Sequence, residues 1–196
     1  MRISGGAFRG RVLSVPKGLD VRPTQDRVRE ALFSMLQNDI CGARFLDLFA
    51  GSGSVGLEAL SRGAAEVVFV EQAPRSLACL AQNIAQLKVE PRCRVIRADV
   101  YGWLAGPSTA FDIVYADPPY ALAAARGYAD MLVRLAEGGF VASDGLFVAE
   151  MAVGQALDLS PAWELCRDRT YGQTRLAIYA VRKKACNLSV PDGYSG

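Results

Sequence analysis

The sequence predicts one α/β domain, with a mostly parallel sheet, helices on both faces, a C-terminal antiparallel hairpin and a small N-terminal hairpin. First, short runs such as residues 67–70 are apolar throughout, which is typical of strands buried on both faces. Second, such runs alternate with segments of helical periodicity, the pattern of parallel α/β sheets. Third, a chain of 196 residues, 51% hydrophobic and 21% charged, suits a single globular domain with a sizeable core.

The N-terminal elements precede this alternation. Residues 3–15 consist of two short extended runs separated by glycines, which predicts a hairpin. A helix is predicted to follow, with Thr24 as its N-cap and its end near Asn38. Its apolar positions recur at helical spacing, at Val28, Leu32, Met35 and Leu36.

The remaining elements follow in alternation. Strands are predicted at residues 44–47, 66–71, 93–96, 111–116 and 145–151. Helices are predicted from Val55, from Pro74, after Asp99 and over residues 121–137. The terminal hairpin is predicted at residues 163–171 and 174–181. Residues 185–196 lack periodicity, which predicts a frayed tail.

Composition excludes several kinds of chemistry. The chain has no histidine, which rules out Ser–His–Asp and Cys–His catalysis and His-ligated zinc. Its five cysteines are far apart and form no C-x-x-C pair, which argues against a metal site or a disulfide framework and for a reducing compartment. The sequence shows neither a signal peptide nor an apolar run that could span a membrane. We therefore expect a soluble cytoplasmic protein without a metal, and we expect it to be a monomer.

Charge is unevenly distributed along a chain whose net charge is only +2. Residues 1–30 hold seven basic and three acidic side chains, and residues 164–184 hold six basic and two acidic ones. Two basic ends around an acidic middle can form one face that meets phosphate. Scattered, solvated arginines explain the same pattern equally well, so charge alone leaves both interpretations open.

A glycine-rich turn predicts a ligand site. Residues 51–56 match G-x-G-x-x-G between a predicted strand and a predicted helix, and Glu71 lies 20 residues after Gly51. Glycines let the backbone approach a ligand, and a carboxylate can bind a ribose diol, so any adenosine ligand fits. Asp47, four residues before the first glycine, would repel a pyrophosphate but attract an ammonium group. The pattern therefore favours S-adenosylmethionine over a dinucleotide.

Asp99 ends the third predicted strand, where its carboxylate can accept a hydrogen bond from an adenine amino group. The same residue is equally well placed as the N-cap of a short helix. Both roles stay open at this point.

Asp117-Pro118-Pro119-Tyr120 ends the fourth predicted strand, at the edge of the sheet where ligands bind in such folds. The two prolines cannot continue the strand and fix the chain in one shape. An exocyclic amine on a base has two N–H donors, which the Asp117 side chain and the Pro118 carbonyl can accept. Tyr120 offers a face on which the base can stack. Methyl transfer to such an amine needs mainly orientation and no histidine.

With these residues the chain resembles class I S-adenosylmethionine-dependent methyltransferases of Rossmann-like fold, and more closely the RsmD family of bacterial 16S rRNA guanine-N2 methyltransferases. The resemblance spans residues 1–184. Its motifs are residues 2–11, Arg22-Pro23-Thr24, residues 27–33, residues 45–53, Glu71, Asp99, Asp117-Pro118-Pro119-Tyr120 and residues 171–174. It implies a seven-stranded sheet, an N-terminal hairpin that grips RNA, and a guanine of the small ribosomal subunit as the substrate.

The resemblance also implies roles for individual residues. The cofactor would be bound by Asp47, Phe49, Ala50, Gly51, Gly53, Glu71, Asp99 and Val100. The target guanine would be held by Asp117, Pro118, Pro119 and Tyr120. RNA would be contacted by Arg9, Arg11, Arg22, Thr24 and Arg27. The implied domains are an RNA-binding extension at 1–20, a methyltransferase domain at 21–184 and a flexible tail at 185–196.

Three other functions stay open. The first is methylation of another amine, in adenine of DNA or RNA or in a protein amide, although 196 residues leave little room for the separate recognition domain of many DNA enzymes. The second is a nicotinamide-dependent oxidoreductase, against which Asp47 and the Asp-Pro-Pro-Tyr turn both argue. The third is an inactive relative that only binds RNA, which the intact Asp117 and Tyr120 make the weaker interpretation.

Overall fold

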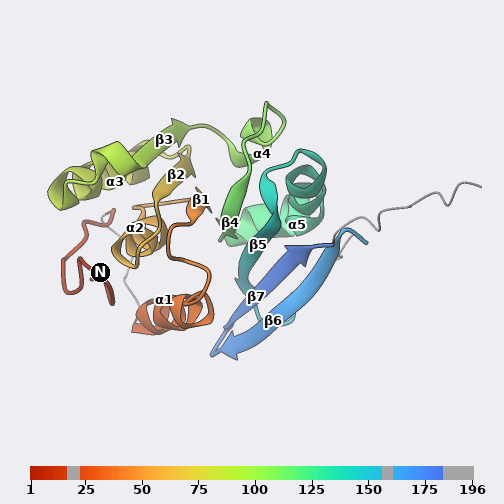
Figure 1. Cartoon of the computed structure of the whole chain (residues 1–196), viewed down its shortest axis with the longest axis horizontal. Helices are drawn as coiled ribbons and strands as arrows, with labels where there is room; N and C mark the ends of the chain where they lie inside the picture. Colours follow the sequence, from red (N-terminus) through yellow and green to blue (C-terminus); the bar gives the residue numbers. More distant parts are fainter. Residues whose placement is uncertain (17–22, 156–160, 183–196) are drawn as a thin grey trace, which may run out of the picture.

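The computed structural model describes residues 1–16, 23–155 and 161–182 of the chain, with the side chains of residues 23–25 and 120–127 left out. Within this part, seven strands form one sheet in the order β3-β2-β1-β4-β5-β7-β6 (Figure 1). The strands are β1 Arg44–Leu48, β2 Glu66–Glu71, β3 Cys93–Arg97, β4 Phe111–Ala116, β5 Val141–Ala152, β6 Trp163–Tyr171 and β7 Thr174–Val181. The strands β1 to β5 are parallel, and β7 pairs antiparallel with both β5 and β6. The predicted fold class is confirmed.

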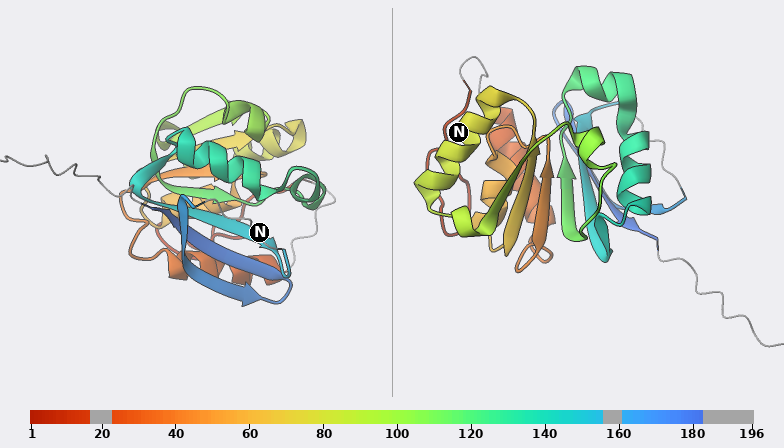
Figure 2. Two further views of the ribbon diagram at one scale, coloured as in Figure 1. Left: turned by 90° about the vertical axis from the view of Figure 1, so that its right-hand side faces the viewer. Right: turned by 90° about the horizontal axis from the view of Figure 1, so that it is seen from above.

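Helices cover both faces of the sheet (Figure 2). They are α1 Pro23–Met35, α2 Ser54–Ser61, α3 Pro74–Leu87, α4 Val100–Trp103 and α5 Tyr120–Glu137, with a 3-10 turn at Glu90–Arg92. One apolar core joins α1, α2 and α3 to the sheet, and a second joins α4 and α5 to the opposite face. Side chains alternate between these cores, so that on β1 Phe45 enters the first while Leu46 and Leu48 enter the second.

The alternation decides where Asp47 lies. Asp47 follows Phe45 by two residues and therefore lies on the face that carries α1, α2 and α3. Its register partner on β4 is Tyr115, which packs in the same core. On β5, Val148 also belongs to that core, so Glu150 two residues later lies on the same face.

The predicted N-terminal hairpin is present, although its strands are very short. An antiparallel bridge joins Arg2 to Val12 with backbone hydrogen bonds of 2.9 Å on both sides of it, and the chain between them curls through turns. Its backbone also binds α2: the amide of Ala7 donates to the Ser61 carbonyl at 2.7 Å. Gly6 has a φ of 76°, and a Cβ there would lie 1.9 Å from that carbonyl oxygen. The segment is therefore shaped both by its own pairing and by its contact with α2.

Three predicted boundaries also differ. The first helix begins at Pro23 and ends at Met35, so Thr24 lies inside it rather than capping it, and the chain turns at residues 36–39. The strand predicted from residue 145 begins at Val141, with a register shift against β4 that the sequence pattern hides. The predicted tail at 185–196 lies outside the described residues. None of the helices in the described ranges is long and apolar enough to cross a membrane.

Candidate active site

The carboxyl ends of β1, β2, β4 and β5 meet at one edge of the sheet. Leu48 is in register with Val70 of β2 and with Ala116 of β4, and Ala116 is in register with Ala149 of β5. The loops that leave these strands therefore start side by side. This edge is where ligands bind in open parallel sheets.

The glycine turn packs closely on the elements beneath it. Phe49, Gly51 and Gly53 all have positive φ, of 62°, 57° and 80°. A Cβ on Gly53 would lie 2.4 Å from a methyl group of Leu80 on α3. The turn therefore needs glycine at position 53 both for its backbone conformation and for its contact with α3.

Glu71 holds this turn in place through hydrogen bonds from backbone amides. Its carboxylate accepts the amide of Gly51 at 2.8 Å and, at the end of β2, the amides of Gln72 and Ala73 at 2.8 and 2.7 Å. Glu71 lies 20 residues after Gly51 in the sequence, and its carboxylate at the end of β2 fixes the loop that leaves the neighbouring strand β1. Two carboxylate oxygens have about four acceptor positions, so one remains for a hydroxyl group.

Asp47 is buried without a cationic partner. It is 1% exposed and accepts the amide of Gly56, the turn's last glycine, at 2.9 Å. Burial raises its pKa to about 7, with a further contribution from the nearby Glu71 and an opposing one from the Gly56 hydrogen bond. Among the described residues no lysine or arginine forms an ion pair with Asp47. The position is therefore suited to a ligand that carries positive charge.

A first cleft of about 230 Å³ opens at the glycine turn, and the predicted Gly53 and Glu71 are not among its lining residues. Its walls include the predicted Asp47, Phe49, Ala50, Gly51 and Asp117. They also include residues that sequence reasoning missed, namely Met1, Val15 and Pro16 of the N-terminal segment, Ser76 of α3 and Tyr115 of β4. The N-terminal segment, residues 1–16, therefore forms part of the wall of this cleft.

Asn83 of α3 joins that segment to the glycine turn. Its side chain is fully buried and bonds Ser14 twice, accepting the amide at 2.7 Å and donating to the carbonyl at 2.9 Å. The same amide group donates to the carbonyl of Ser52 in the turn at 2.9 Å. One side chain thus fixes two walls of the first cleft relative to each other.

Glu58 of α2 anchors the start of the segment. Its buried carboxylate accepts the amides of Ser4 and Gly5, both at 2.9 Å, and pairs with Arg29 at 3.0 Å and Arg62 at 2.9 Å. Burial alone would raise its pKa, but the hydrogen bonds from Ser4 and Arg62 and the charge of Arg29 lower it instead. The segment is therefore attached at both ends, to α2 and to α3.

A second cleft of about 210 Å³ opens beside the first. It is lined by Asp117, Pro118, Tyr128, Glu150, Met151, Ala152, Gln155, Gln173 and Thr174. Asp117 lines both clefts and so lies at their junction. Of the predicted residues whose side chains the structure describes, Asp117 and Pro118 line this second cleft.

Asp117 is surrounded by other acids although its side chain reaches solvent. Desolvation by the surrounding protein raises its pKa well above the usual range, and the charges of Glu150 and Asp47 raise it further. Glu150 accepts a hydrogen bond from the Tyr115 hydroxyl at 2.6 Å. Burial raises the pKa of Glu150, while that hydrogen bond and the charge of Arg29 oppose the rise. The junction can therefore hold a proton, and it favours ligands that bring N–H donors or positive charge.

Other predicted residues lie away from the two clefts. Asp99 caps α4, accepting the amide of Gly102 at 2.9 Å, and Val100 is buried in the core beside α4. Neither is among the residues that line the clefts. Pro119 precedes α5, and Tyr120 begins that helix, but the Tyr120 side chain lies outside the described part.

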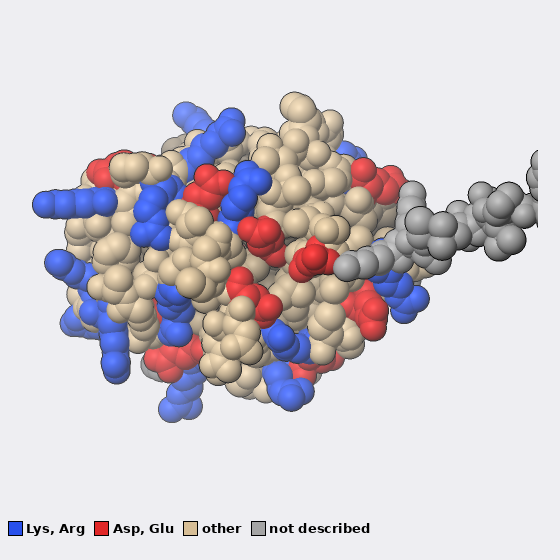
Figure 3. Space-filling model, in the orientation of Figure 1, with Lys and Arg blue, Asp and Glu red and all other residues tan. Residues whose placement is uncertain are grey.

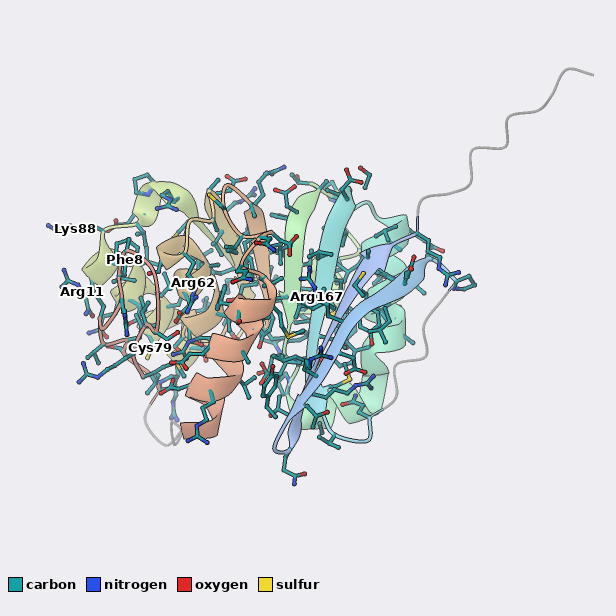
Figure 4. All side chains as sticks on the ribbon, turned by 60° about the horizontal axis from the view of Figure 1, so that its bottom comes forward. Phe8, Arg11, Arg62, Cys79, Lys88 and Arg167 are labelled. Carbon is teal, nitrogen blue, oxygen red and sulfur yellow. The ribbon has the colours of Figure 1, made fainter. Side chains whose placement is uncertain are left out.

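The predicted RNA-binding residues are partly described. Arg9 and Arg11 are exposed on the N-terminal segment, and Arg27 is exposed on α1. The Arg22 residue and the Thr24 side chain lie outside the described part. Basic side chains project from the end of the molecule formed by the N-terminal segment and α3, while acidic ones gather nearer the middle (Figure 3). Arg11 and Lys88 point outward at this same end (Figure 4).

A third cleft, of about 540 Å³, lies at the opposite edge of the sheet. It is lined by residues at the start of the strands, including Arg44, Glu66, Arg94 and Phe111. Arg44 is already paired with Glu66 at 2.6 Å. No residue predicted for catalysis or cofactor binding lines it.

Two site residues, Glu150 and Tyr115, were not predicted from the sequence. Glu150 interrupts the apolar run at residues 146–152 of β5 and lines the second cleft together with Asp117. A single acid within that apolar run was the available signal. Tyr115 sits inside a buried strand and carried no such signal, because an aromatic residue there is typical of a core.

The chain is similar to known proteins over most of its length. The family model described as "Conserved hypothetical protein 95" matches residues 1–180. The chain is 40% identical to ribosomal RNA small subunit methyltransferase D of Escherichia coli, covering 91% of this chain and 89% of that protein. It is 34% identical to the protein of the same name from Haemophilus influenzae, covering 91% and 93%.

Solved structures agree with this similarity. The Escherichia coli protein yhhF has a TM-score of 0.83 at 36% identity, covering 94% of this chain and 99% of that one. A protein from Thermus thermophilus has a TM-score of 0.75 at 34% identity, covering 92% and 99%. Together with the two clefts and the Asp-Pro-Pro-Tyr turn, these findings show that the chain belongs to the Conserved hypothetical protein 95 family, the RsmD family of methyltransferases.

Proposed function

We propose that this protein transfers a methyl group from S-adenosylmethionine to the exocyclic N2 amine of a guanine in 16S rRNA of the small ribosomal subunit. The observation that carries the proposal is the position of Asp117 at the junction of two clefts. A methyl transfer needs donor and acceptor to meet in line, each in its own pocket. Relatives named as small subunit rRNA methyltransferases support the RNA class.

The first cleft fits the cofactor. S-adenosylmethionine carries an ammonium and a sulfonium group and no phosphate, and the buried, unpaired Asp47 would hold such a cation. The glycine turn would hold the methionine part, and Glu71, which binds the amide of Gly51, would hold the ribose. The adenine would reach past the lining of this cleft to Asp99 and Val100. When bound, the cofactor supplies a methyl group that is already activated on sulfur.

The second cleft fits the base. Asp117 and the Pro118 carbonyl would accept the two N–H groups of the guanine amine and so aim its nitrogen lone pair at the methyl carbon. Tyr120 would stack on the base, and Pro119 would hold the turn rigid. Orientation of this kind contributes about 7–11 kcal/mol to a reaction of two bound partners.

Asp117 can accept the proton that the amine loses during methyl transfer. As the carbon–nitrogen bond forms, the carbon–sulfur bond breaks, and one proton must then leave the amine. Asp117 would already be hydrogen-bonded to that amine, its pKa is raised by burial and by neighbouring acids, and it reaches solvent. It can therefore accept the proton and release it to water.

The N-terminal segment would carry the RNA contacts. Arg9 and Arg11 are exposed on it, while Glu58 and Asn83 fix it against the first cleft. We propose that residues 1–20 act as an RNA-binding extension and that Arg22, Thr24 and Arg27 continue the contact. RNA bound there would lie next to the site of transfer.

Labelled S-adenosylmethionine, unmethylated small subunits, naked 16S rRNA and genomic DNA test the proposal. After digestion, N2-methylguanosine from the subunits or the rRNA is the expected product. N6-methyladenine from DNA would overturn the substrate but leave the cofactor in place. A thermal melt tests the cofactor separately: S-adenosylhomocysteine should raise the melting temperature and NADH should not.

A further inference from the structure

Glu150 has a defined place beside the proposed acceptor site. Ala116 and Ala149 are register partners, and Asp117 and Glu150 follow them on the neighbouring parallel strands β4 and β5. Both side chains line the second cleft. The Tyr115 hydroxyl donates to one carboxylate oxygen of Glu150 at 2.6 Å, and the Tyr128 hydroxyl donates to its backbone carbonyl. Glu150 is therefore held firmly, with acceptor positions left over.

Stability does not account for this arrangement. The two carboxylates share a partly desolvated cleft: burial raises the pKa of both Asp117 and Glu150, and the charge of Glu150 raises that of Asp117 further. In the described residues no arginine or lysine forms an ion pair with either of them. Glu58 on α2, another carboxylate shielded from solvent, is by contrast paired with two arginines. A ligand that brings N–H donors would supply hydrogen-bond partners for Asp117 and Glu150.

We propose that Glu150 is a specificity-determining residue that accepts the N1–H of the target guanine, while Asp117 accepts its neighbouring N2 amine. This inference rests on the proposed function and adds the reading of the base to it. It differs from the proposed role of the Asp-Pro-Pro-Tyr turn, which any exocyclic amine could use.

The chemistry of the bases supports the assignment. Guanine carries N1–H directly beside its N2 amine, so both donors point in the same direction. Adenine has a lone pair at the same ring position, and a carboxylate there would repel it. Burial raises the pKa of Glu150, and the Tyr115 hydrogen bond and the charge of Arg29 oppose this rise and so favour the ionised form. Gln155 and Gln173 line the same cleft and offer amide donors for the guanine O6.

The test exchanges the acceptor for a donor. Glu150→Gln keeps the shape of the side chain and can still accept from Tyr115, but it turns an amide N–H toward the base. RNA substrates are made with either guanine or 2-aminopurine at the methylated position; 2-aminopurine keeps the amine but has an acceptor at N1. Glu164→Gln, at an exposed position on β6, is the matched control.

Wild-type enzyme should strongly prefer guanine. Glu150→Gln should lower kcat/KM for guanine by roughly 5- to 150-fold, the value of one good base contact, and should lower the preference for guanine over 2-aminopurine by at least as much. Glu164→Gln should change neither quantity. The melting temperature and its shift with S-adenosylhomocysteine should match the wild type, because Glu150 lies outside the cofactor cleft.

Two outcomes would overturn the inference in distinguishable ways. If wild type methylates guanine N2 and Glu150→Gln keeps the wild-type preference for guanine, Glu150 does not read the base, even if overall activity falls. If wild type does not methylate guanine at all, the proposed function itself fails. Tyr115→Phe gives a second check: it should reduce the preference for guanine less than Glu150→Gln, because the carboxylate remains but is no longer held.

Discussion

The two clefts that meet at Asp117 are built in different ways. The first is made of backbone turns held by hydrogen bonds: Glu71 binds the glycine turn, and Asn83 joins it to the N-terminal segment. The second is made of side chains from separate strands, and its acids Asp117 and Glu150 repel each other. The walls of the first cleft are thus fixed by hydrogen bonds, with Asp47 as the acid that a cation would neutralise, whereas the second cleft consists mainly of acceptors that need donors from a ligand.

This difference indicates that the first cleft is suited to binding the cofactor and the second to selecting the substrate. A cleft formed by fixed backbone can bind a constant cofactor without rearrangement. A cleft with unsatisfied acceptors gains most from a ligand with matching donors, which makes it suited to selecting a substrate. Substitutions on the two sides should therefore separate transfer from cofactor binding.

The largest effect is expected at the junction. Asp117→Ala should reduce methyl transfer by about 10²–10³-fold, the usual loss when one preorganised partner of the reacting group is removed. Cofactor affinity, measured by calorimetry, should stay near the wild-type value because the backbone turn is intact. Asp130→Ala, which breaks only an exposed pair with Arg134, serves as the control. Near-normal turnover of Asp117→Ala would contradict the assigned role.

A reciprocal effect is expected in the first cleft. Asp47→Asn should weaken cofactor binding by roughly 10- to 100-fold, because a hydrogen bond to a charged group contributes about 1.5–3 kcal/mol. The measurement is a calorimetric titration with S-adenosylmethionine. An affinity equal to that of wild type would show that Asp47 does not hold the cation.

The same residue predicts a pH dependence. Because burial raises the pKa of Asp47 to about 7, its carboxylate is half protonated near neutral pH, and cofactor affinity should rise between about pH 6 and 8. In the free protein the sign is opposite. The neutral form stabilises the fold below the unfolded pKa of about 4, and this contribution is lost as pH rises through about 7. Asp47→Asn should flatten both curves; unchanged curves would assign the titration to another group.

A smaller effect is expected from the link between segment and turn. Asn83→Ala removes three hydrogen bonds and leaves partly buried backbone groups of Ser14 and Ser52 without that partner. We expect a loss of about 1–3 kcal/mol in unfolding free energy and a several-fold weaker cofactor affinity. Gln86→Ala on the same helix, whose amide donates to Val12 at an exposed position, is the control. Cofactor affinity that stays unchanged would show that the two walls act independently.

The smallest effect is expected at the basic segment, because its two arginines are a small part of an RNA interface. Arg9→Glu with Arg11→Glu should weaken RNA binding and lower its dependence on salt concentration, since fewer phosphates are neutralised. Filter binding across a salt series measures both. An unchanged salt slope would remove these arginines from the RNA contact.

The sequence predicted the parts that depend on local patterns. The strands β2, β4, β6 and β7 and the helix that starts at Pro74 match their predicted bounds, because apolar periodicity reports burial directly. The glycine turn was predicted for the same reason, since its acid, glycines and flanking strand lie within one short segment. These features make up most of the first cleft.

The missed parts depend on contacts between distant residues. Glu150 and Asp117 are 33 positions apart and meet only because β4 and β5 are neighbours in the sheet. The N-terminal segment forms the predicted hairpin, but it also binds α2 through Glu58, a contact that its own residues do not reveal. Glu71 binds the turn amides, which its motif does not reveal, whereas the α4 cap at Asp99 was one of the two roles that the sequence left open. Local sequence patterns predict single elements and motifs, whereas contacts between distant residues depend on the topology of the sheet.

A crystal structure with S-adenosylhomocysteine tests the central claim most directly. We expect the ligand in the first cleft, with its amino group at Asp47 and its sulfur facing Asp117, so that a methyl group on that sulfur would point into the second cleft. Ligand in the second cleft, or in the third cleft lined by Arg44 and Arg94 at the opposite edge of the sheet, would contradict the claim that transfer occurs at the junction.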